Sequence, residues 1–451
     1  MQPCQPGDND VVRSCRACAA LPRFCTLLSA LVLSLLLLCL PLRAASQDAA
    51  GFVGSDPAGN LLIEPPAGRA VLVGPQRLDV VAQIELLQAQ NARLQADLAA
   101  SQLVHSWRRV FRRYPQRESW VPVRVDATVH GPTVFVAVCW HKQAGASDGL
   151  AEVITWPLDH FWATHTYEVA SLVTAAEQSV PSNCQFFVMK SQLYLFVAVA
   201  RSPGGSLSAN SKLFVWQSTR FTEAQTLATQ GAQGATYFSI GSLSLLAVAN
   251  QRNPKLKINS ELFLWDGSNF QPNFQLIPTA GAHDWVHFVE GNRTFLAWAG
   301  NSNDTTSAIH GEILEWNPAK ELFEPFQTFP TDWAKDVDYI VVSSNAAMRF
   351  LLVGNAQRDS ALYRWTGQGF ALHQPLDASA FWRHVPSWHG QDLLISSSGA
   401  IYTWNPATLL FDKIPAEAPI RMDSNPGLLL ASNAAFLVAS DADQLVIYRM
   451  G

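Results

Sequence analysis

The amino-acid sequence predicts an all-β fold, a seven-bladed β-propeller, over residues 108–451. A short strand that ends in an aromatic residue recurs seven times, at spacings of 39 to 60 residues. This is close to the period of about 40–50 residues that propeller blades show. A nearly continuous apolar strand precedes each copy, as expected of strands buried on both faces. The last repeat stops one strand short, and a matching segment stands ahead of the first repeat.

Each repeat contains four predicted strands, named a to d in chain order. Strand b is the apolar strand, and strand c ends in the aromatic residue. A turn such as Asn317-Pro318 follows strand c, and in five repeats strand d then opens on phenylalanine. Seven such four-stranded repeats make a seven-bladed propeller. The strand-c aromatics are Trp156, Trp216, Trp265, Trp316, Trp365, Trp404 and Tyr448, and the strand-d phenylalanines are Phe221, Phe270, Phe323, Phe370 and Phe411.

The two ends of the repeat region predict how the ring closes. The seventh repeat ends without a strand d, whereas Val110–Gln116 precedes the first repeat and is similar to the strand d at Phe323–Gln327. We therefore expect residues near 108–116 to form the outer strand of the last blade. A ring closed in this way has no open sheet edge.

The repeats resemble a known family when three segments of one copy are taken together. These are Leu-Ala-Val-Ala-Asn at 246–250, Leu-Phe-Leu-Trp at 262–265 and Phe-x-x-x-x-Gln at 270–275. The combination is similar to the epilepsy-associated repeat (EAR, also EPTP), on which the leucine-rich glioma-inactivated (epitempin) secreted proteins are built. The resemblance implies a non-enzymatic, seven-bladed extracellular propeller that binds cell-surface proteins. Residues 1–107 contain no leucine-rich repeats and the sixth and seventh b–c loops are short, so no relative's partner is carried over.

The N-terminal region contains an uncharged apolar segment at residues 24–42. As a helix it spans ~28 Å, enough for a bilayer core. Three arginines precede it and one follows, so the positive-inside rule keeps residues 1–23 cytoplasmic unless they belong to a cleaved leader. A type II signal anchor and a signal peptide cleaved after Ala44-Ala45-Ser46 both remain open. Both interpretations place residues 47–451 outside the cytosol, at the cell membrane or secreted.

Residues 43–79 are rich in glycine, proline and alanine and are interpreted as a stalk, with a loop at 51–57 and short strands at 61–63 and 70–73. Residues 80–107 are predicted to form a coiled-coil helix. Its a/d heptad seam runs from Val80 to Ser101 and places Asn91 at an a position. The seam predicts a homo-oligomer, and the alternative is a monomeric helix that packs on the next domain.

Composition excludes some classes of protein. Net charge is −5 with a pI near 6.1, which argues against nucleic-acid binding. Five of the seven cysteines lie in the first 39 residues, so the chain is no disulfide scaffold. Cys15 and Cys18 lack a second pair or a nearby histidine, which favours juxtamembrane cysteines over a redox or zinc site. Cys139 and Cys184 either pair with each other or are small core residues.

The search for chemistry predicts no catalytic residue, no cofactor and no metal site. The sequence has no zincin, nucleophile-elbow, P-loop or EF-hand motif. His283 and His287 would lie ~13 Å apart on a strand, too far to share a metal. The pairs Asp336/Asp338 and Asp441/Asp443 are interpreted as solvated carboxylates, because calcium prefers about 6–8 oxygen ligands.

The predicted function is binding, through the face that carries the b–c loops and the d–a connections. These b–c loops, at 141–152, 201–211, 251–260 and 301–311, differ between repeats while the strands recur. The expected partner is a cell-surface or extracellular protein, or a glycan. The candidate contacts are bulky aromatics and nearby polar residues in connecting segments: Trp285, Trp333, Trp382, His384, Asp284 and Asp336.

Two alternatives stay open at this face. The tryptophans could plug the channel between blades instead of contacting a partner. The competing class of protein is a glycan-acting hydrolase with Asp284, Asp336 and Asp338 at the channel mouth, which needs two carboxylates that converge from different blades.

Two further features bear on the surface. Asn292 and Asn303 begin N-glycosylation sequons in predicted loops. Five arginines lie between Arg108 and Arg117. They predict either a patch for anionic glycans or lipid headgroups, or an outer strand whose charge prevents edge pairing.

Overall fold

The computed structural model divides the chain into two units, Met1–Ala96 and Asp97–Gly451. The structure describes residues 52–55, 61–64, 72–73, 76–77, 88, 90, 108–113, 120–142, 148–158, 167–388, 390–417, 427–431, 434–441 and 444–450. The segment 24–42 lies outside these ranges. In the part of the chain that is described, no helix has the length and apolar character needed to cross a bilayer.

The first unit contains two short antiparallel hairpins. Strand β1 (Phe52–Ser55) pairs with β2 (Leu61–Glu64), and β3 (Leu72–Val73) pairs with β4 (Gln76–Arg77). The loop expected over 51–57 is therefore wrong for residues 52–55, because pairing with β2 gives their backbone groups hydrogen-bond partners. Of the expected coiled-coil helix over 80–107, the structure describes only Gln88 and Gln90, both helical and exposed.

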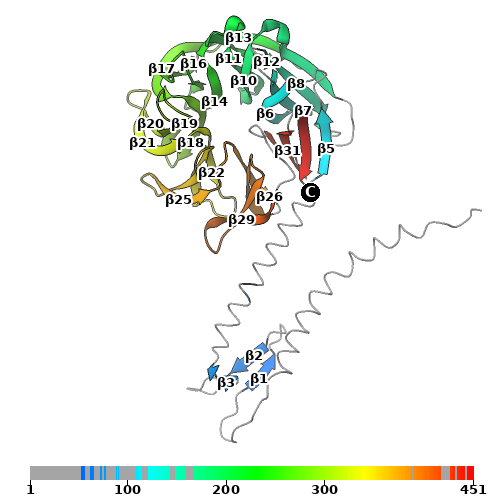
Figure 1. Ribbon diagram of the computed structural model, residues 1–451, viewed down its shortest axis with the longest axis vertical. Helices are drawn as coiled ribbons and strands as arrows, with labels where there is room; N and C mark the ends of the chain where they lie inside the picture. The colour runs from blue at the N-terminus through cyan, green and yellow to red at the C-terminus, as the bar shows by residue number, and fades with distance from the viewer. Residues whose placement is uncertain are drawn as a thin grey trace, which may run out of the picture. The chain divides into compact units, whose positions relative to one another are not determined.

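The second unit is a seven-bladed propeller, as predicted, and every blade is a four-stranded antiparallel sheet (Figure 1). Blades 1 to 3 contain β6 (Trp120–His130), β7 (Thr133–Lys142), β8 (Gly149–Pro157), β9 (Glu168–Val173); β10 (Val180–Met189), β11 (Gln192–Arg201), β12 (Ser208–Trp216), β13 (Phe221–Gln230); and β14 (Ala232–Ile240), β15 (Leu243–Asn250), β16 (Lys257–Trp265), β17 (Phe270–Ala280). Two 3-10 turns, η2 (Ala175–Glu177) and η3 (Pro203–Gly205), lie in connections of the first two blades.

Blades 4 to 7 continue the same order from the inner strand to the outer one. They contain β18 (Ala282–Glu290), β19 (Arg293–Gly300), β20 (Ala308–Asn317), β21 (Leu322–Asp332); β22 (Ala334–Val341), β23 (Arg349–Asn355), β24 (Ser360–Trp365), β25 (Phe370–Leu376); β26 (Trp382–Trp388), β27 (Gln391–Ser396), β28 (Ala400–Asn405), β29 (Leu410–Glu417); and β30 (Gly427–Ala431), β31 (Ala434–Asp441), β32 (Gln444–Met450) with β5 (Arg108–Arg113).

The ring closes as the sequence predicts. Strand β5 pairs antiparallel with β32, with Phe111 opposite Ile447 and Arg108 opposite Arg449, so it is the outer strand of the last blade. Figure 1 shows this cyan strand beside the red strands of the C-terminal repeat. Because its partner comes from the other end of the repeat region, the first and last blades are locked together by main-chain hydrogen bonds.

The core consists of clusters between neighbouring blades. Among the described residues, seven clusters of buried apolar side chains each combine two adjacent blades, and together they go once around the ring. The cluster between blades 7 and 1, for example, joins Phe436 and Ile447 to Val136 and Trp156. The alternating burial of propeller strands therefore attaches each sheet to both of its neighbours.

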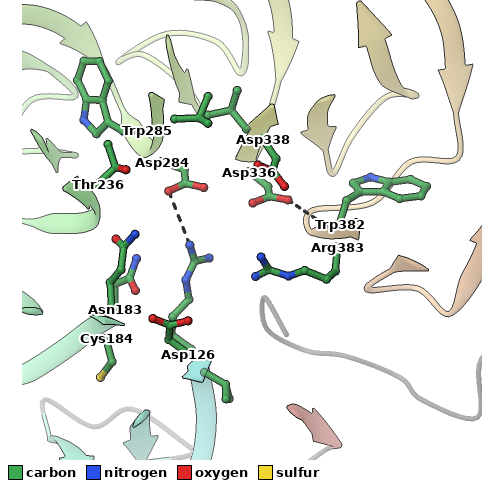
Figure 2. A pocket seen from close by; sticks show the side chains of 15 residues that line it. Asp126, Asn183, Cys184, Thr236, Asp284, Trp285, Asp336, Asp338, Trp382 and Arg383 are labelled. Carbon is green, nitrogen blue, oxygen red and sulfur yellow. Dashed lines mark hydrogen bonds and ion pairs between the residues drawn. The ribbon is translucent and has the colours of Figure 1, made fainter. Parts of the chain in front are cut away.

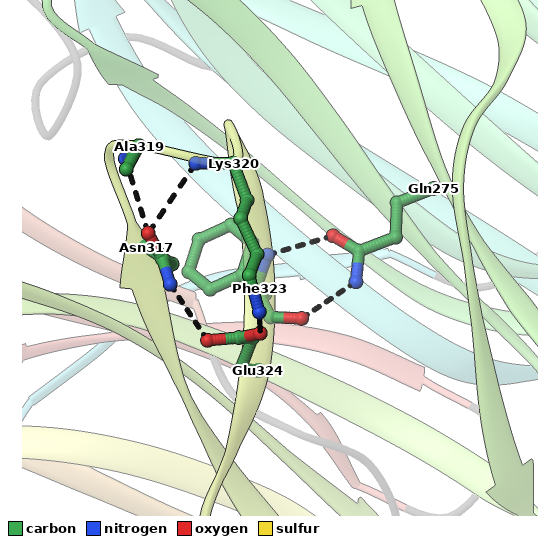
Figure 3. Close-up of polar contacts among 6 residues, drawn as sticks. All are labelled: Gln275, Asn317, Ala319, Lys320, Phe323 and Glu324. Atoms are coloured by element: carbon green, nitrogen blue, oxygen red, sulfur yellow. Dashed lines mark hydrogen bonds and ion pairs between the residues drawn. The ribbon is translucent and has the colours of Figure 1, made fainter.

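A repeated glutamine adds a polar link between blades. Gln275 Nε2 donates to Phe323 O over 2.7 Å, and Phe323 N donates to Gln275 Oε1 over 2.9 Å (Figure 3). The side-chain amide thus satisfies both main-chain groups of a strand-d residue in the next blade. The same double bond joins Gln225 to Phe270, Gln327 to Phe370 and Gln374 to Phe411. We call these four pairs the glutamine clips.

Blades 1 and 2 are also joined covalently. Cys139 of β7 and Cys184 of β10 form a disulfide with Cα atoms 6.1 Å apart. Both residues are fully buried in the cluster between these blades. The sequence leaves open a disulfide or two small core residues, and the structure contains the disulfide.

Candidate functional site

One face of the propeller carries b–c loops of unequal length. The connections between the second and third strands have six or seven residues in blades 1 to 4, and four, three and two residues in blades 5, 6 and 7. The short sixth and seventh loops agree with the sequence analysis, and the fifth is also short. The d–a connections lie on the same face, which we call the raised loop face after the longer b–c loops of four contiguous blades.

The raised loops bond to one another across blade boundaries. Asn253 Nδ2 donates to Ser208 Oγ over 2.9 Å, and Leu256 N donates to Asp304 Oδ1 over 2.9 Å. Ser307 Oγ donates to Gln357 Oε1 over 3.1 Å. Blades 2 to 5 therefore share a hydrogen-bonded rim, and this rim holds its side chains in defined positions.

The d–a corner of blade 5 differs from its neighbours. Gly231, Gly281 and Trp333 precede three successive inner strands with φ of 56°, 56° and 53°. Each carbonyl accepts a hydrogen bond from the adjacent b–c loop, for instance from Ala356 N to Trp333 O over 3.3 Å. A left-handed backbone conformation, with positive φ, is unfavourable for a bulky L-residue. Blade 5 nevertheless has tryptophan at this position, with a partly exposed side chain.

The centre of the ring contains a cavity of about 200 Å³. Its lining comes from the inner strands of blades 1 to 6, near the ends where the d–a connections enter. Figure 2 shows Asp284, Asp336, Asp338 and Arg383 converging on one space. The charged and polar lining residues are Arg124, Asp126, Asn183, Gln185, Thr236, Asp284, Asp336, Asp338 and Arg383.

Two of the carboxyl groups form a coupled pair. Asp284 and Asp336 come from neighbouring blades and interact electrostatically, and Arg124 Nη2 lies 3.7 Å from Asp284 Oδ1. Burial, together with the charge of Asp284, raises the pKa of Asp336 to about 7. Burial also raises the pKa of Asp284, although the positive charge of Arg124 opposes the rise. The pair therefore takes up a proton more readily than two isolated carboxyl groups would.

Several of these carboxylates also hold the blades together. Asp336 Oδ2 accepts from Trp382 N over 2.8 Å, which links blades 5 and 6. Asp126 accepts from its neighbour Ala127 N over 2.9 Å and from Phe186 N of blade 2 over 2.6 Å. Burial raises the pKa of Asp126 and of Asp338 as well.

The structure separates the six candidate contact residues into different environments. Trp285 and Trp382 are 4% and 1% exposed, so neither presents its ring at a surface. Trp382 Nε1 donates to Ser360 Oγ over 3.0 Å, and the ring packs against Tyr402. These two residues match the alternative in which tryptophans fill the space between blades, because β18 and β26 begin early enough to include them.

The other four candidates divide between the cavity, a buried histidine–aspartate contact and the rim. Asp284 and Asp336 meet in the cavity. His384 Nε2 lies 2.8 Å from Asp392 Oδ1 in a mostly buried pair. Trp333 is the aromatic candidate on the rim. His283 and His287 are neutral core histidines, since burial lowers their pKa values to about 3 and about 4.

The hydrolase alternative requires two carboxyl groups at a defined separation. Retaining glycosidases hold their two carboxyl groups about 5–5.5 Å apart, and inverting enzymes hold them farther apart. Asp284 and Asp336 are electrostatically coupled, and both also contact neighbouring protein groups, Arg124 for Asp284 and Trp382 N for Asp336. Within the described residues, no group of three or more histidine, cysteine or acidic side chains is arranged to hold a metal ion.

The two sequons lie at opposite ends of strand β19. Asn292 is exposed in the turn before β19, and Asn303 is partly exposed in the loop after it. Asn303 Oδ1 accepts from Thr305 N and Thr306 N, which orders the loop. Attached glycans would project from opposite faces of blade 4.

Sequence reasoning missed three charged residues of the cavity, Arg124, Asp126 and Arg383. Each belongs to the first strand of a blade. A charged residue two positions from another on such a strand, as with Arg124 and Asp126, was the available signal, because positions i and i+2 share a face.

The fold and the rim define the class of protein, a closed seven-bladed propeller built from EAR-like repeats with one raised loop face. The comparisons agree. The chain is 34% identical over 168 residues to the human thrombospondin-type laminin G domain and EAR repeat-containing protein, a match that covers 36% of this chain and 24% of the relative. The mouse protein of the same name is 31% identical over 187 residues, with 40% and 27% covered.

The predicted resemblance to EAR-repeat propellers is confirmed by these matches. The chain spans about a quarter of the length of the curated relatives that it matches. No protein-family model matches the chain.

Proposed function

We propose that this protein is a non-enzymatic binding scaffold and that its partner docks on the raised loop face. Trp333 is the observation that carries the proposal. Gly231 and Gly281 occupy the equivalent corners, so a purely structural role at residue 333 would favour glycine. A partly exposed tryptophan on a strained backbone is typical of residues that a function retains.

The partner that we propose is a cell-surface or extracellular protein, or a glycan that it carries. Three features support a location outside the cytosol. The buried Cys139–Cys184 disulfide suits an oxidising compartment. Asn292 and Asn303 are accessible acceptors for N-glycans. The apolar segment 24–42 then acts either as a type II anchor or as a cleaved signal peptide.

We further propose that the Val80–Ser101 seam drives self-association. Asn91 at an a position would select one register and one oligomeric state. Replacing Leu87 and Leu94 with lysine is expected to yield monomers in light scattering. A wild-type chain that is already monomeric at micromolar concentration contradicts the proposal.

The test of the binding face uses two changes at one residue. Trp333→Gly removes the ring and relieves the backbone, so we expect the melting temperature to rise while binding to intact partner-bearing cells falls. Trp333→Ala removes the ring and leaves the strain. Loss of binding in both variants, despite opposite changes in stability, assigns the loss to the ring itself.

Leu372→Ala is the matched control, because Leu372 is an apolar residue of the same blade with 63% of its surface exposed on outer strand β25. Cell binding measured by flow cytometry should be unchanged in this variant. Undiminished binding of both Trp333 variants would move the partner site away from the raised face.

The competing function is glycan hydrolysis at the central cavity, because three carboxylates named from the sequence do meet there. The contacts of Asp284 and Asp336 with neighbouring protein groups give it less support than the binding function has. Release of sugar from a glycan panel by the wild-type chain, abolished in Asp336→Asn, would favour the hydrolase.

A further inference from the structure

The central cavity offers hydrogen-bond donors and acceptors side by side. Asp284, Asp336 and Asp338 supply carboxylate oxygens, while Arg124 and Arg383 supply guanidinium groups. Figure 2 shows that Asp284, Asp336, Asp338 and Arg383, from the inner strands of blades 4, 5 and 6, reach the same space. A site for a cation would present acceptors alone, and a site for an anion would present donors alone. This cavity presents both.

One of the donor atoms in the cavity has no hydrogen-bond partner within the protein. Arg124 is 8% exposed and its Nη2 pairs with Asp284, but its buried Nη1 has no hydrogen-bond partner. The guanidinium carbon lies 5.4 Å from the centre of the Phe381 ring, so a ring face covers another side of the group. A buried donor without a partner is unfavourable. Arg124 Nη1 therefore points to a ligand that carries an acceptor oxygen.

The available acceptor is Asp338. Asp126 bonds to two main-chain N–H groups, and Asp284 and Asp336 are coupled to each other and contact Arg124 and Trp382 N. The one hydrogen bond identified for Asp338 is from Tyr339 N to Oδ1 over 2.8 Å, and its side chain is partly exposed. A carboxylate has about four lone-pair sites, so Asp338 can accept from a ligand.

Hydroxyl groups satisfy both requirements, because each donates one hydrogen bond and accepts up to two. Two hydroxyls on adjacent carbons can bond to a guanidinium and a carboxylate at once. The volume of about 200 Å³ is below the range of about 300–1,000 Å³ typical of sites for drug-sized ligands. It is suited to one sugar ring and excludes an extended oligosaccharide.

We propose that the cavity binds the terminal sugar of a glycan through a vicinal diol, with Arg124 donating to the ligand and Asp338 accepting from it. The inference rests on the proposed function, since the glycan would belong to the partner docked on the raised face. It assigns the partner's contact chemistry: protein surface on the rim and one sugar residue in the centre.

The experiment measures binding of free methyl hexopyranosides to the full chain. Saturation-transfer NMR reports contact with the sugar protons, and tryptophan emission reports the cavity because Trp285 and Trp382 line it. We expect dissociation constants on the order of 1 mM, as suits so small a ligand. Asp338→Asn and Arg124→Lys should each weaken binding at least about tenfold, equivalent to one charge-assisted hydrogen bond.

Asp338→Asn keeps an oxygen for Tyr339 N, so it tests the site even if Arg124→Lys fails to fold. Asp359→Asn is the matched control, since Asp359 is exposed in the loop of the same blade and does not line the cavity. It should bind the sugars like wild type. Equal weakening in Asp359→Asn would overturn the proposal.

Other outcomes also overturn it. Absence of any sugar signal does so directly. A response to Ca²⁺ alone that Asp338→Asn abolishes would make the cavity a cation site, and a response to acetate alone would make it an anion site.

If sugars bind as expected while the Trp333 variants retain cell binding, the cavity inference stands and the rim proposal fails.

Discussion

At the scale of single residues, Asp336 shows how one carboxyl group combines structural and chemical roles. Its Oδ2 accepts a hydrogen bond from the main chain of the next blade, and its carboxyl group is coupled to that of Asp284. A carboxyl group with a raised pKa at a blade boundary makes that boundary sensitive to pH.

We predict that Asp336→Asn changes the pH dependence of stability. The pKa of Asp336 is about 7 when folded and about 3.9 when unfolded. Between these values the folded state holds a proton that the unfolded chain has released. The stabilisation by this proton is complete below about pH 4 and is lost as the pH rises through about 7. Asparagine keeps an acceptor oxygen for Trp382 N without ionising.

The variant should therefore gain melting temperature relative to wild type as the pH rises from 5 to about 8. Asp359→Asn should run parallel to wild type over this range. A constant difference between Asp336→Asn and wild type would mean that Asp336 is ionised throughout.

At the scale of elements, the glutamine clips explain a spacing that recurs along the sequence. The glutamine follows the strand-d phenylalanine by four or five residues, and its amide reaches the phenylalanine of the next blade. The motif is therefore a contact between repeats, which is why it recurs without catalytic neighbours.

Gln275→Ala should lower the free energy of unfolding by about 1–3 kcal/mol, because Phe323 N and O then lose their partners. Gln271→Ala, in the same strand, removes only an exposed bond to Asp266 and should change stability by less than about 0.5 kcal/mol. Chemical denaturation of both variants measures the difference. Equal effects would assign no special stability to the clip.

Another prediction at this scale concerns the disulfide between β7 and β10. The cysteines are 45 residues apart in sequence, and a cross-link of this length typically contributes about 2–4 kcal/mol. Reduction, or the double change Cys139→Ala with Cys184→Ala, should lower the melting temperature without loss of the β-sheet signal in circular dichroism. An unchanged melting temperature after verified reduction would contradict this.

At the scale of the whole molecule, ring closure depends on a strand borrowed from the other end of the repeats. Deleting residues 108–116 should leave β32 as an open edge and cause a large loss of melting temperature together with aggregation in light scattering. Deleting residues 47–79 should leave the propeller transition in place. Similar transitions in both deletions would show that β5 contributes little to closure.

Much of this architecture follows from local patterns in the sequence. The recurring strand-c tryptophans and the missing seventh strand d predict blade number and closure, because strand alternation and repeat period are properties of neighbouring residues. The cavity is different. Arg124, Asp284 and Asp338 come from three blades, and no local pattern states that they meet.

The misplacement of Trp285 and Trp382 has the same origin. The sequence pattern places both in connecting segments, but β18 and β26 begin at Ala282 and at Trp382 itself. A shift of a few residues at a strand boundary moved both rings from a surface to the core. Trp333 stayed on the rim because β22 begins just after it.

The unequal loop lengths of the raised loop face have a consequence for stoichiometry and orientation. Seven equal blades would offer a partner seven equivalent rotational settings about the ring axis. Four contiguous long loops and three short ones would reduce these settings to one. The loss of a sevenfold choice would cost about 1 kcal/mol of mixing entropy in the complex. A partner that binds as we propose would therefore have one defined rotational orientation about the ring axis.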